Sequence, residues 1–391
     1  MAKNGYRIFD ADTHTGPVME VLDKYLTNAE RSKLPAWDEF KIKHSSEDHY
    51  KDGTTYNRGN RKYRRRLGET KIEDKKSVGY TPEFTGPEKK RTATPSARMD
   101  LDPALRIEEM DLEGVDVNLM LPSGWFGTWT SSDDIALEMG MYRGYHRWTD
   151  DYCRSYPERL GGVLIVSARD IAGSLDEIHR WGKSRWAWGV LPWAPYGMPI
   201  DHPDLEPIWA AAQEHDLVIT LHTVTAMPPY SPGGLDNWEN MFLQRSAAHP
   251  WCGMRNMAAL LGNGVMDRYP RLRIGTLEAG HGWLPFWLAR IDEHAETCKS
   301  SIQKLKCKPS EYVQSGRYFQ SIEIHEGAEI TNSVSDLLGD NVLMYGSDYP
   351  HGESRWPESV NSVMAWDMPE ARKRKLLWDN PVKFYARSGL K

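Results

Sequence analysis

Short apolar runs alternate with longer stretches of helical periodicity along most of the 391-residue chain. Eight of these runs have the length and the apolar content of buried strands. They lie at residues 6–14, 115–121, 162–167, 186–191, 218–222, 272–278, 318–324 and 342–347. Repeated strand–helix units imply a parallel sheet, and eight units favour a closed (β/α)8 TIM barrel over an open doubly wound sheet.

The helical stretches carry start and stop signals. Asp102 can cap a helix whose first position is Pro103, and Gly114 can end that helix. Further helices are expected at 18–26, 133–156, 174–181, 204–215, 237–261, 284–300 and 328–338, with extra C-terminal helices over 357–387. A polar insertion at about 35–100 interrupts the pattern after the first strand. We therefore predict a single barrel domain over residues 1–391 with this insertion as an irregular arm.

Composition excludes several classes of protein. Hydrophobic residues make up 40% of the chain and charged residues 27%, which is typical of a globular protein. No run approaches the ~20 apolar residues of a membrane span. The N-terminus lacks the apolar core of a signal peptide, and the four cysteines show no C-x-x-C spacing. We expect a reduced, cytoplasmic protein with no membrane partner.

The insertion is basic in a chain whose net charge is −6. Residues 41–91 hold fifteen Lys/Arg and eight Asp/Glu, a local charge of +7 that leaves −13 for the rest. A basic stretch such as residues 61–66 can bind nucleic acid, but Gly, Thr and Tyr interrupt the charges and no other feature resembles a nucleic-acid module. We favour an arm that lies on an acidic neighbour, and therefore a homo-oligomer or a hetero-oligomer with a related barrel subunit, without nucleic acid.

Ionisable residues stand where four of the predicted strands end. Asp10-Ala-Asp-Thr-His14 closes the first run, and alternate side chains of a strand share a face, so Asp12 and His14 point the same way. Active-site groups of barrels gather at the carboxyl ends of the strands. The sequence therefore predicts a metal site there, with six candidate ligands: Asp12, His14, His222, Glu278, His281 and Asp348.

Each candidate also has an ordinary structural explanation. Asp12 and His14 can form a salt bridge or a cap, Glu278 can orient a ligating histidine, and His281 can cap the following helix or bind substrate. Three further residues are expected to contact the substrate or the ligands: His351, Trp125 and His325. The remaining histidines, His249 among them, are interpreted as structural or solvated.

These motifs, in this order, resemble the amidohydrolase superfamily. The similar branch is the amidohydrolase-related group that contains the aminocarboxymuconate semialdehyde and resorcylate decarboxylases. The stretch from Glu278-Ala-Gly-His281 to Asp292 resembles that group's strand-six signature, Arg106–Asp116 resembles its first helix, and Gly346-Ser-Asp-Tyr-Pro-His351 resembles its last strand end. Two departures stand out. The group commonly has His-x-His or Glu-x-His after strand one, and Glu278 replaces its strand-six catalytic His.

The resemblance implies a metal-dependent enzyme that acts on a small carboxylic acid through a metal-bound water, by hydrolysis or decarboxylation, with Asp348, Glu278 and His281 as catalytic residues. Mixed carboxylate and imidazole ligation suits Zn, Mn or Fe. One metal rarely needs six protein ligands, and the ligand types also resemble the metal-bearing chain of α-aminoisobutyrate hydroxylase. The alternatives are therefore a dinuclear Fe/Mn monooxygenase subunit and a non-catalytic, metal-containing partner subunit.

Overall fold

The computed structural model describes residues 3, 5–17, 19–32, 41–43, 54–56, 100–122, 134–194, 198–222, 246–247, 249–351 and 354–391. Trp125 and most of the predicted insertion lie outside these residues. Within the insertion, β2 (Lys41–Lys43) and β3 (Thr54–Tyr56) form a two-stranded antiparallel ladder. No helix in the described part of the chain is long and apolar enough to cross a membrane.

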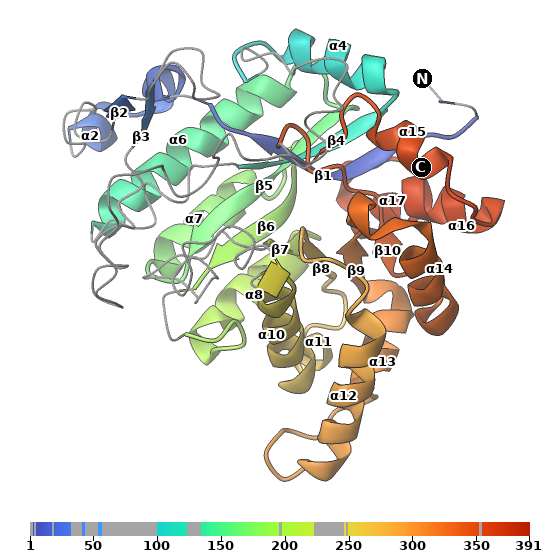
Figure 1. Cartoon of the computed structure of the whole chain (residues 1–391). Helices are drawn as coiled ribbons and strands as arrows, with labels where there is room; N and C mark the ends of the chain where they lie inside the picture. The colour runs from blue at the N-terminus through green and yellow to red at the C-terminus, as the bar shows by residue number, and fades with distance from the viewer. Residues whose placement is uncertain are drawn as a thin grey trace.

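Eight parallel strands form one sheet at the centre of the molecule, with helices around the outside (Figure 1). In sheet order they are β1 (Phe9–Thr15), β4 (Val117–Pro122), β5 (Leu160–Ser167), β6 (Ala187–Trp193), β7 (Val218–His222), β8 (Ile274–Leu277), β9 (Tyr318–Ser321) and β10 (Leu343–Met344). Backbone hydrogen bonds from Ala11 N to Tyr345 O (3.0 Å) and from His14 N to Tyr349 O (2.7 Å) join the first strand to the segment after the last. The predicted (β/α)8 barrel is confirmed.

The larger helices begin where the sequence supplies a capping side chain. Asp102 accepts a hydrogen bond from Ala104 N (2.9 Å), and Gly114, with φ +89°, ends the helix. Asp134 and Asp170 cap two further helices, and Asp170 starts its helix earlier than predicted. These larger helices are α4 (Pro103–Glu113), α6 (Ile135–Cys153), α7 (Ile171–Trp181), α8 (Glu206–Glu214), α10 (His249–Gly262), α12 (Leu284–Thr297) and α14 (Gly327–Leu338).

Short helical segments fill the remaining connections. The predicted C-terminal helices are present as α15 (Ser359–Met364), α16 (Glu370–Arg374) and α17 (Asn380–Phe384). The others are α1 (Met19–Leu22), α2 (Asn28–Arg31), α11 (Val265–Arg268), α13 (Pro309–Tyr312), η1 (Asp23–Tyr25), η4 (Pro203–Leu205), η7 (Val313–Arg317), η8 (Ile324–Glu326), η9 (Lys375–Asp379) and η10 (Ala386–Ser388).

Three strands end earlier than predicted. The runs 272–278, 318–324 and 342–347 end as strands at Leu277, Ser321 and Met344. Glu278, with φ +48°, cannot continue a strand. Tyr345 N donates to Leu376 O (2.9 Å) instead of to a neighbouring strand, so the chain leaves the sheet at that point. The early ends of the runs 272–278 and 342–347 occur where the chain turns to present the acidic side chains Glu278 and Asp348.

Arg106 of α4 holds the carboxyl end of β1 by hydrogen bonds from the outer helical layer. Its guanidinium is fully buried and donates to His14 O (2.9 Å) and to Thr13 Oγ1 (2.7 Å). A buried arginine is tolerated where its terminal nitrogens have such acceptors, although Nε of Arg106 makes no hydrogen bond among the described residues. The strand end that carries His14 is therefore held in place by a helix of the outer layer.

Replacing Arg106 with methionine should lower the free energy of unfolding by about 2–4 kcal/mol, because two buried acceptors lose their donor. Urea unfolding monitored by circular dichroism measures this loss. The control is Arg154→Met, whose side chain is 67% exposed, and we expect that change to cost less than about 0.5 kcal/mol. Equal costs at both positions would show that Arg106 does not stabilise the strand end.

Candidate metal centre

Asp12 and His14 lie side by side at the end of β1. Both are 2% exposed, and His14 Nε2 lies 3.5 Å from Asp12 Oδ1. The strand contains an irregularity between Asp10 and Thr13, yet the two side chains still point to the same side. The shared face expected from strand periodicity is therefore present.

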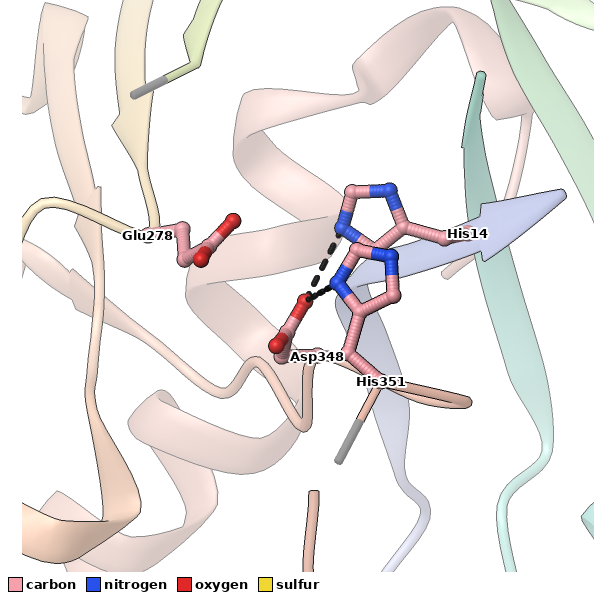
Figure 2. A group of neighbouring side chains, drawn as sticks. All are labelled: His14, Glu278, Asp348 and His351. Carbon is pink, nitrogen blue, oxygen red and sulfur yellow. Dashed lines mark hydrogen bonds and ion pairs between the residues drawn. The ribbon is translucent and has the colours of Figure 1, made fainter. Parts of the chain in front are cut away.

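Asp348 and His351 reach the same place from the loop after β10 (Figure 2). Asp348 Oδ1 lies 3.0 Å from His14 Nε2 and 2.7 Å from His351 Nδ1. The rings of His14 and His351 are stacked, with centroids 4.0 Å apart. One carboxylate oxygen thus faces two imidazoles that come from opposite ends of the sequence.

His222 and Glu278 complete the cluster from adjacent strands. The register between β7 and β8 sets His222 opposite Leu277, so Glu278 is one residue beyond it. His222 Nε2 lies 3.2 Å from Glu278 Oε2 and 3.6 Å from Asp12 Oδ1. Five of the six predicted ligands, all except His281, are therefore in one group of contacts, together with His351.

Backbone conformation and small residues shape this group. Glu278 and Asp348 have φ of +48° and +58°, a left-handed conformation that is unfavourable for non-glycine residues and common at functional sites. Ser321 of β9 accepts a hydrogen bond from Glu278 N (3.0 Å) and donates one to Asp12 Oδ2 (3.3 Å). Gly346 allows close approach, since a Cβ there would lie 2.8 Å from Asp12 Cβ.

The carboxylates of the cluster stabilise positive charge close to them. Burial alone would lower the pKa of His14, but contacts with Asp12 and Asp348 and their charges raise it to about 10. Burial would raise the pKa of Asp348, but His351 and His14 hold it well below its usual range. Both shifts have one cause: acidic groups in a buried site stabilise any cation among them, whether a proton or a metal ion.

The donor atoms fit a metal ion. Asp12 Oδ1, His14 Nε2 and Asp348 Oδ2 are buried and make no hydrogen bond among the described residues. The residues form two overlapping groups, and within each group the ligand atoms all lie within 4.8 Å of one another. His14 belongs to both groups. The first group is His14, Glu278, Asp348 and His351, and the second is Asp12, His14 and His222. Nitrogen and carboxylate ligands of this kind suit Zn, Mn or Fe.

His281 lies outside both groups. Its ring is fully buried, with Nδ1 2.9 Å from Glu326 Oε2 and Nε2 2.9 Å from Thr331 Oγ1. Glu326 also accepts hydrogen bonds from the backbone N–H groups of His281 and Gly282. In the described structure, His281 therefore anchors the loop that follows Glu278. His325, a further predicted residue, is 66% exposed and faces Glu323.

Replacing His281 with asparagine should leave the metal content unchanged and lower the free energy of unfolding by about 1–3 kcal/mol, since Glu326 and Thr331 lose the buried ring that they contact. Burial would raise the pKa of Glu326, but His281 lowers it to about 2. The pair therefore stabilises the fold above the unfolded-state pKa and loses its effect as the pH falls from about 4.5 toward 2. Urea unfolding at several pH values should show the difference between variant and wild type narrowing in acid. Loss of metal in the variant would instead make His281 a ligand.

Two residues near the cluster were missed in the sequence. His249, the first residue of α10, has Nδ1 3.6 Å from Glu278 Oε1. Burial raises the pKa of Glu323 well above its usual range, and the charges of Glu278 and Asp348 raise it further. Glu323 follows β9 and could have been noticed as an acid at a strand end. His249 gave no such signal, because it fell inside a predicted helix.

The fold and the cluster define a (β/α)8 barrel that gathers histidines and carboxylates at the carboxyl ends of its strands. A family model described as amidohydrolase matches residues 93–387, and the chain belongs to this family. The resemblance found in the sequence is thereby confirmed.

Several relatives of the chain are decarboxylases. The 2-amino-3-carboxymuconate-6-semialdehyde decarboxylase of Dictyostelium discoideum is 24% identical over 290 residues, which cover 72% of this chain and 76% of that protein. The gamma-resorcylate decarboxylase of a Polaromonas species is 20% identical over 321 residues, 79% of this chain and 93% of that one. The solved 5-carboxyvanillate decarboxylase of Novosphingobium aromaticivorans, with bound manganese, has a TM-score of 0.68 at 19% identity and 98% coverage of both chains.

Proposed function

We propose that this protein is a metal-dependent carboxy-lyase that removes CO2 from a small, hydroxylated aromatic carboxylic acid. The observation that carries the proposal is the set of buried donor atoms of Asp12, His14 and Asp348 that lack hydrogen bonds among the described residues. Leaving polar atoms buried without partners costs free energy, and a bound cation removes that cost. The decarboxylase relatives support the reaction class, and their aromatic substrates support the substrate class.

The residues of the two overlapping groups would hold the ion, and His14 and Asp348 would be its principal ligands. A bound divalent cation would supply positive charge that holds the substrate carboxylate and stabilises charge developing during the reaction. Manganese in the Novosphingobium structure supports Mn as one choice for this chain. Zn and Fe suit the same ligands.

Asp348 and His351 would manage the proton. Decarboxylation breaks the bond between the ring carbon and the carboxyl carbon, leaves the electron pair on the ring carbon, and requires a proton there. His351 is placed to deliver that proton, and the ionised carboxylate of Asp348, 2.7 Å from His351 Nδ1, holds the imidazole in position. The side chain of His351 is 14% exposed, so it can exchange protons with solvent. The balance is one proton taken up for each CO2 released.

The test is to load the protein separately with Mn, Zn or Fe(II) and to incubate it with a panel of hydroxybenzoates and aliphatic acids in D2O. We expect CO2 release from an aromatic acid, deuterium on the carbon that carried the carboxylate, and loss of activity with a chelator. Absence of CO2 release from every acid, with hydrolysis of an ester or amide panel, would replace the proposal with the hydrolytic alternative.

A second candidate function is hydroxylation with dioxygen at a dinuclear Fe/Mn centre. It is favoured by the two oxygens of Glu278, which face different imidazoles: Oε2 faces His222 at 3.2 Å, and Oε1 faces His249 at 3.6 Å. A carboxylate that faces two ligand groups can bridge two ions. This reaction also needs an external two-electron reductant. Oxygen uptake that depends on such a reductant and on a small acid would favour it over decarboxylation.

A further inference from the structure

We propose that His179, Glu214 and His215 form a second cation site on the protein surface, which binds a divalent d-block ion such as Zn²⁺. His179 Nδ1 and His215 Nε2 lie 3.0 Å apart. Each of the three residues offers a ligand atom, and these atoms all lie within 4.8 Å of one another. The site is independent of the proposed reaction and of the candidate metal centre.

The spacing of the two nitrogens already suits a shared ion. Zn–N bonds of about 2.0–2.1 Å at a tetrahedral angle place two imidazole nitrogens of one ion roughly 3.3–3.4 Å apart. In the structure the same nitrogens share a hydrogen bond, for which one ring donates and the other accepts. A metal ion would therefore replace one shared proton while the two nitrogens separate by only about 0.3–0.4 Å.

The ring of His215 is held in place by its surroundings. Gly182 ends α7, and a Cβ there would lie 2.5 Å from His215 Cγ and 2.8 Å from its Nδ1. The backbone carbonyl of His215 accepts a hydrogen bond from Arg387 (3.2 Å). Because the ring packs directly on the glycine and its backbone is tethered, Nε2 is directed at His179 before any ion binds.

Some charges near the site favour a bound cation, and others oppose it. His179 lies in the last turn of α7, and Glu214 and His215 end α8, so two helix carboxyl ends with partial negative charge converge. The negative charge of Glu214 acts on His215 together with the positive charges of Arg387 and Lys183. The lysine and the arginine limit the affinity.

Ligand chemistry selects the type of ion. Two imidazoles and one carboxylate suit Zn, Ni or Cu, whereas Mg and Ca prefer oxygen ligands only. The position separates the two sites: His215 lies before β7 begins, and His222 ends the same strand. The surface site is therefore at the amino end of the barrel strands, opposite the candidate metal centre.

Isothermal titration of the metal-loaded protein with Zn²⁺, in a buffer that does not bind metal, tests this site. We expect one additional equivalent to bind, and His179→Ala to weaken that binding by more than about tenfold while the basal activity is unchanged. The control is His294→Ala, which removes an exposed histidine of α12 and should keep the additional equivalent. A second variant, Glu214→Gln, should weaken binding less than His179→Ala. Equal uptake of Zn²⁺ by wild type, His179→Ala and His294→Ala, or no uptake beyond the loaded ion, would overturn the proposal.

Discussion

Replacing His14 with alanine is expected to remove the bound ion and to lower the turnover number by at least about a thousandfold, equivalent to about 4 kcal/mol of barrier. His14 is the one residue that belongs to both groups of potential ligands. Its Nε2 also faces the carboxylates of Asp12 and Asp348, which would repel each other without a cation between them. Elemental analysis and CO2 release measure the two effects, and circular dichroism checks that the barrel remains folded.

The matched control for this variant is His325→Ala. His325 follows β9 on the loop after that strand, but its side chain is 66% exposed and it lies outside the cluster. We expect this variant to retain both metal and activity. Full metal content in His14→Ala, or equal losses in the two variants, would contradict the position of the metal centre.

Replacing Glu278 with glutamine is expected to lower activity by about a hundredfold, about 3 kcal/mol, while one ion per chain remains. The amide keeps the shape of the side chain but removes the charge that faces His222. In a decarboxylase whose one ion is held chiefly by His14 and Asp348, the charge of Glu278 affects substrate binding and the electrostatic potential of the site. It affects metal retention less. Metal content and the steady-state constants of the variant measure these effects together.

The number of ions in Glu278→Gln separates the two candidate functions. A fall from about two ions to one would make Glu278 a bridging ligand and favour oxygen activation. A fall from one ion to none would make it an indispensable ligand of a single ion. The control is Glu326→Gln, because Glu326 contacts His281 and not the cluster, and it should keep the ion.

The barrel could be predicted from the sequence because its strands and helices are locally encoded. The apolar runs that end at His222 and at Ser167 have the same ends as the observed strands β7 and β5. The cap at Asp102 and the stop at Gly114 each act within one helical turn. The run that ends at Glu278 was predicted too long, since the left-handed backbone there depends on tertiary contacts such as the Ser321 hydrogen bond.

The sequence predicted only those members of the cluster that lie at or near the end of a strand. Asp12, His14, His222 and Asp348 follow from one rule, that functional groups of a barrel gather at the carboxyl ends of its strands. His281 lies four residues past the end of its strand at Leu277, where the direction of the chain decides which way the ring points. Glu326 and Thr331 take both of its nitrogens, and both belong to a later segment of the chain.

Residues outside that rule could not be found from one sequence. His249 begins α10 and reaches Glu278 only because that helix packs beside the strand ends. Ser321 lies inside the predicted run 318–324 and gave no signal there, although its hydroxyl joins Glu278 to Asp12. Long-range packing decides such contacts, and no local spacing encodes them.

The metal content per chain tests the central claim most directly. The protein is purified without oxygen or chelators, in the His179→Ala background so that the proposed surface site does not contribute. We expect about one ion of Mn, Fe or Zn per chain, and none when His14→Ala is added. A chain that contains no transition metal after reconstitution, or one that keeps its ion without His14, would contradict the metal centre.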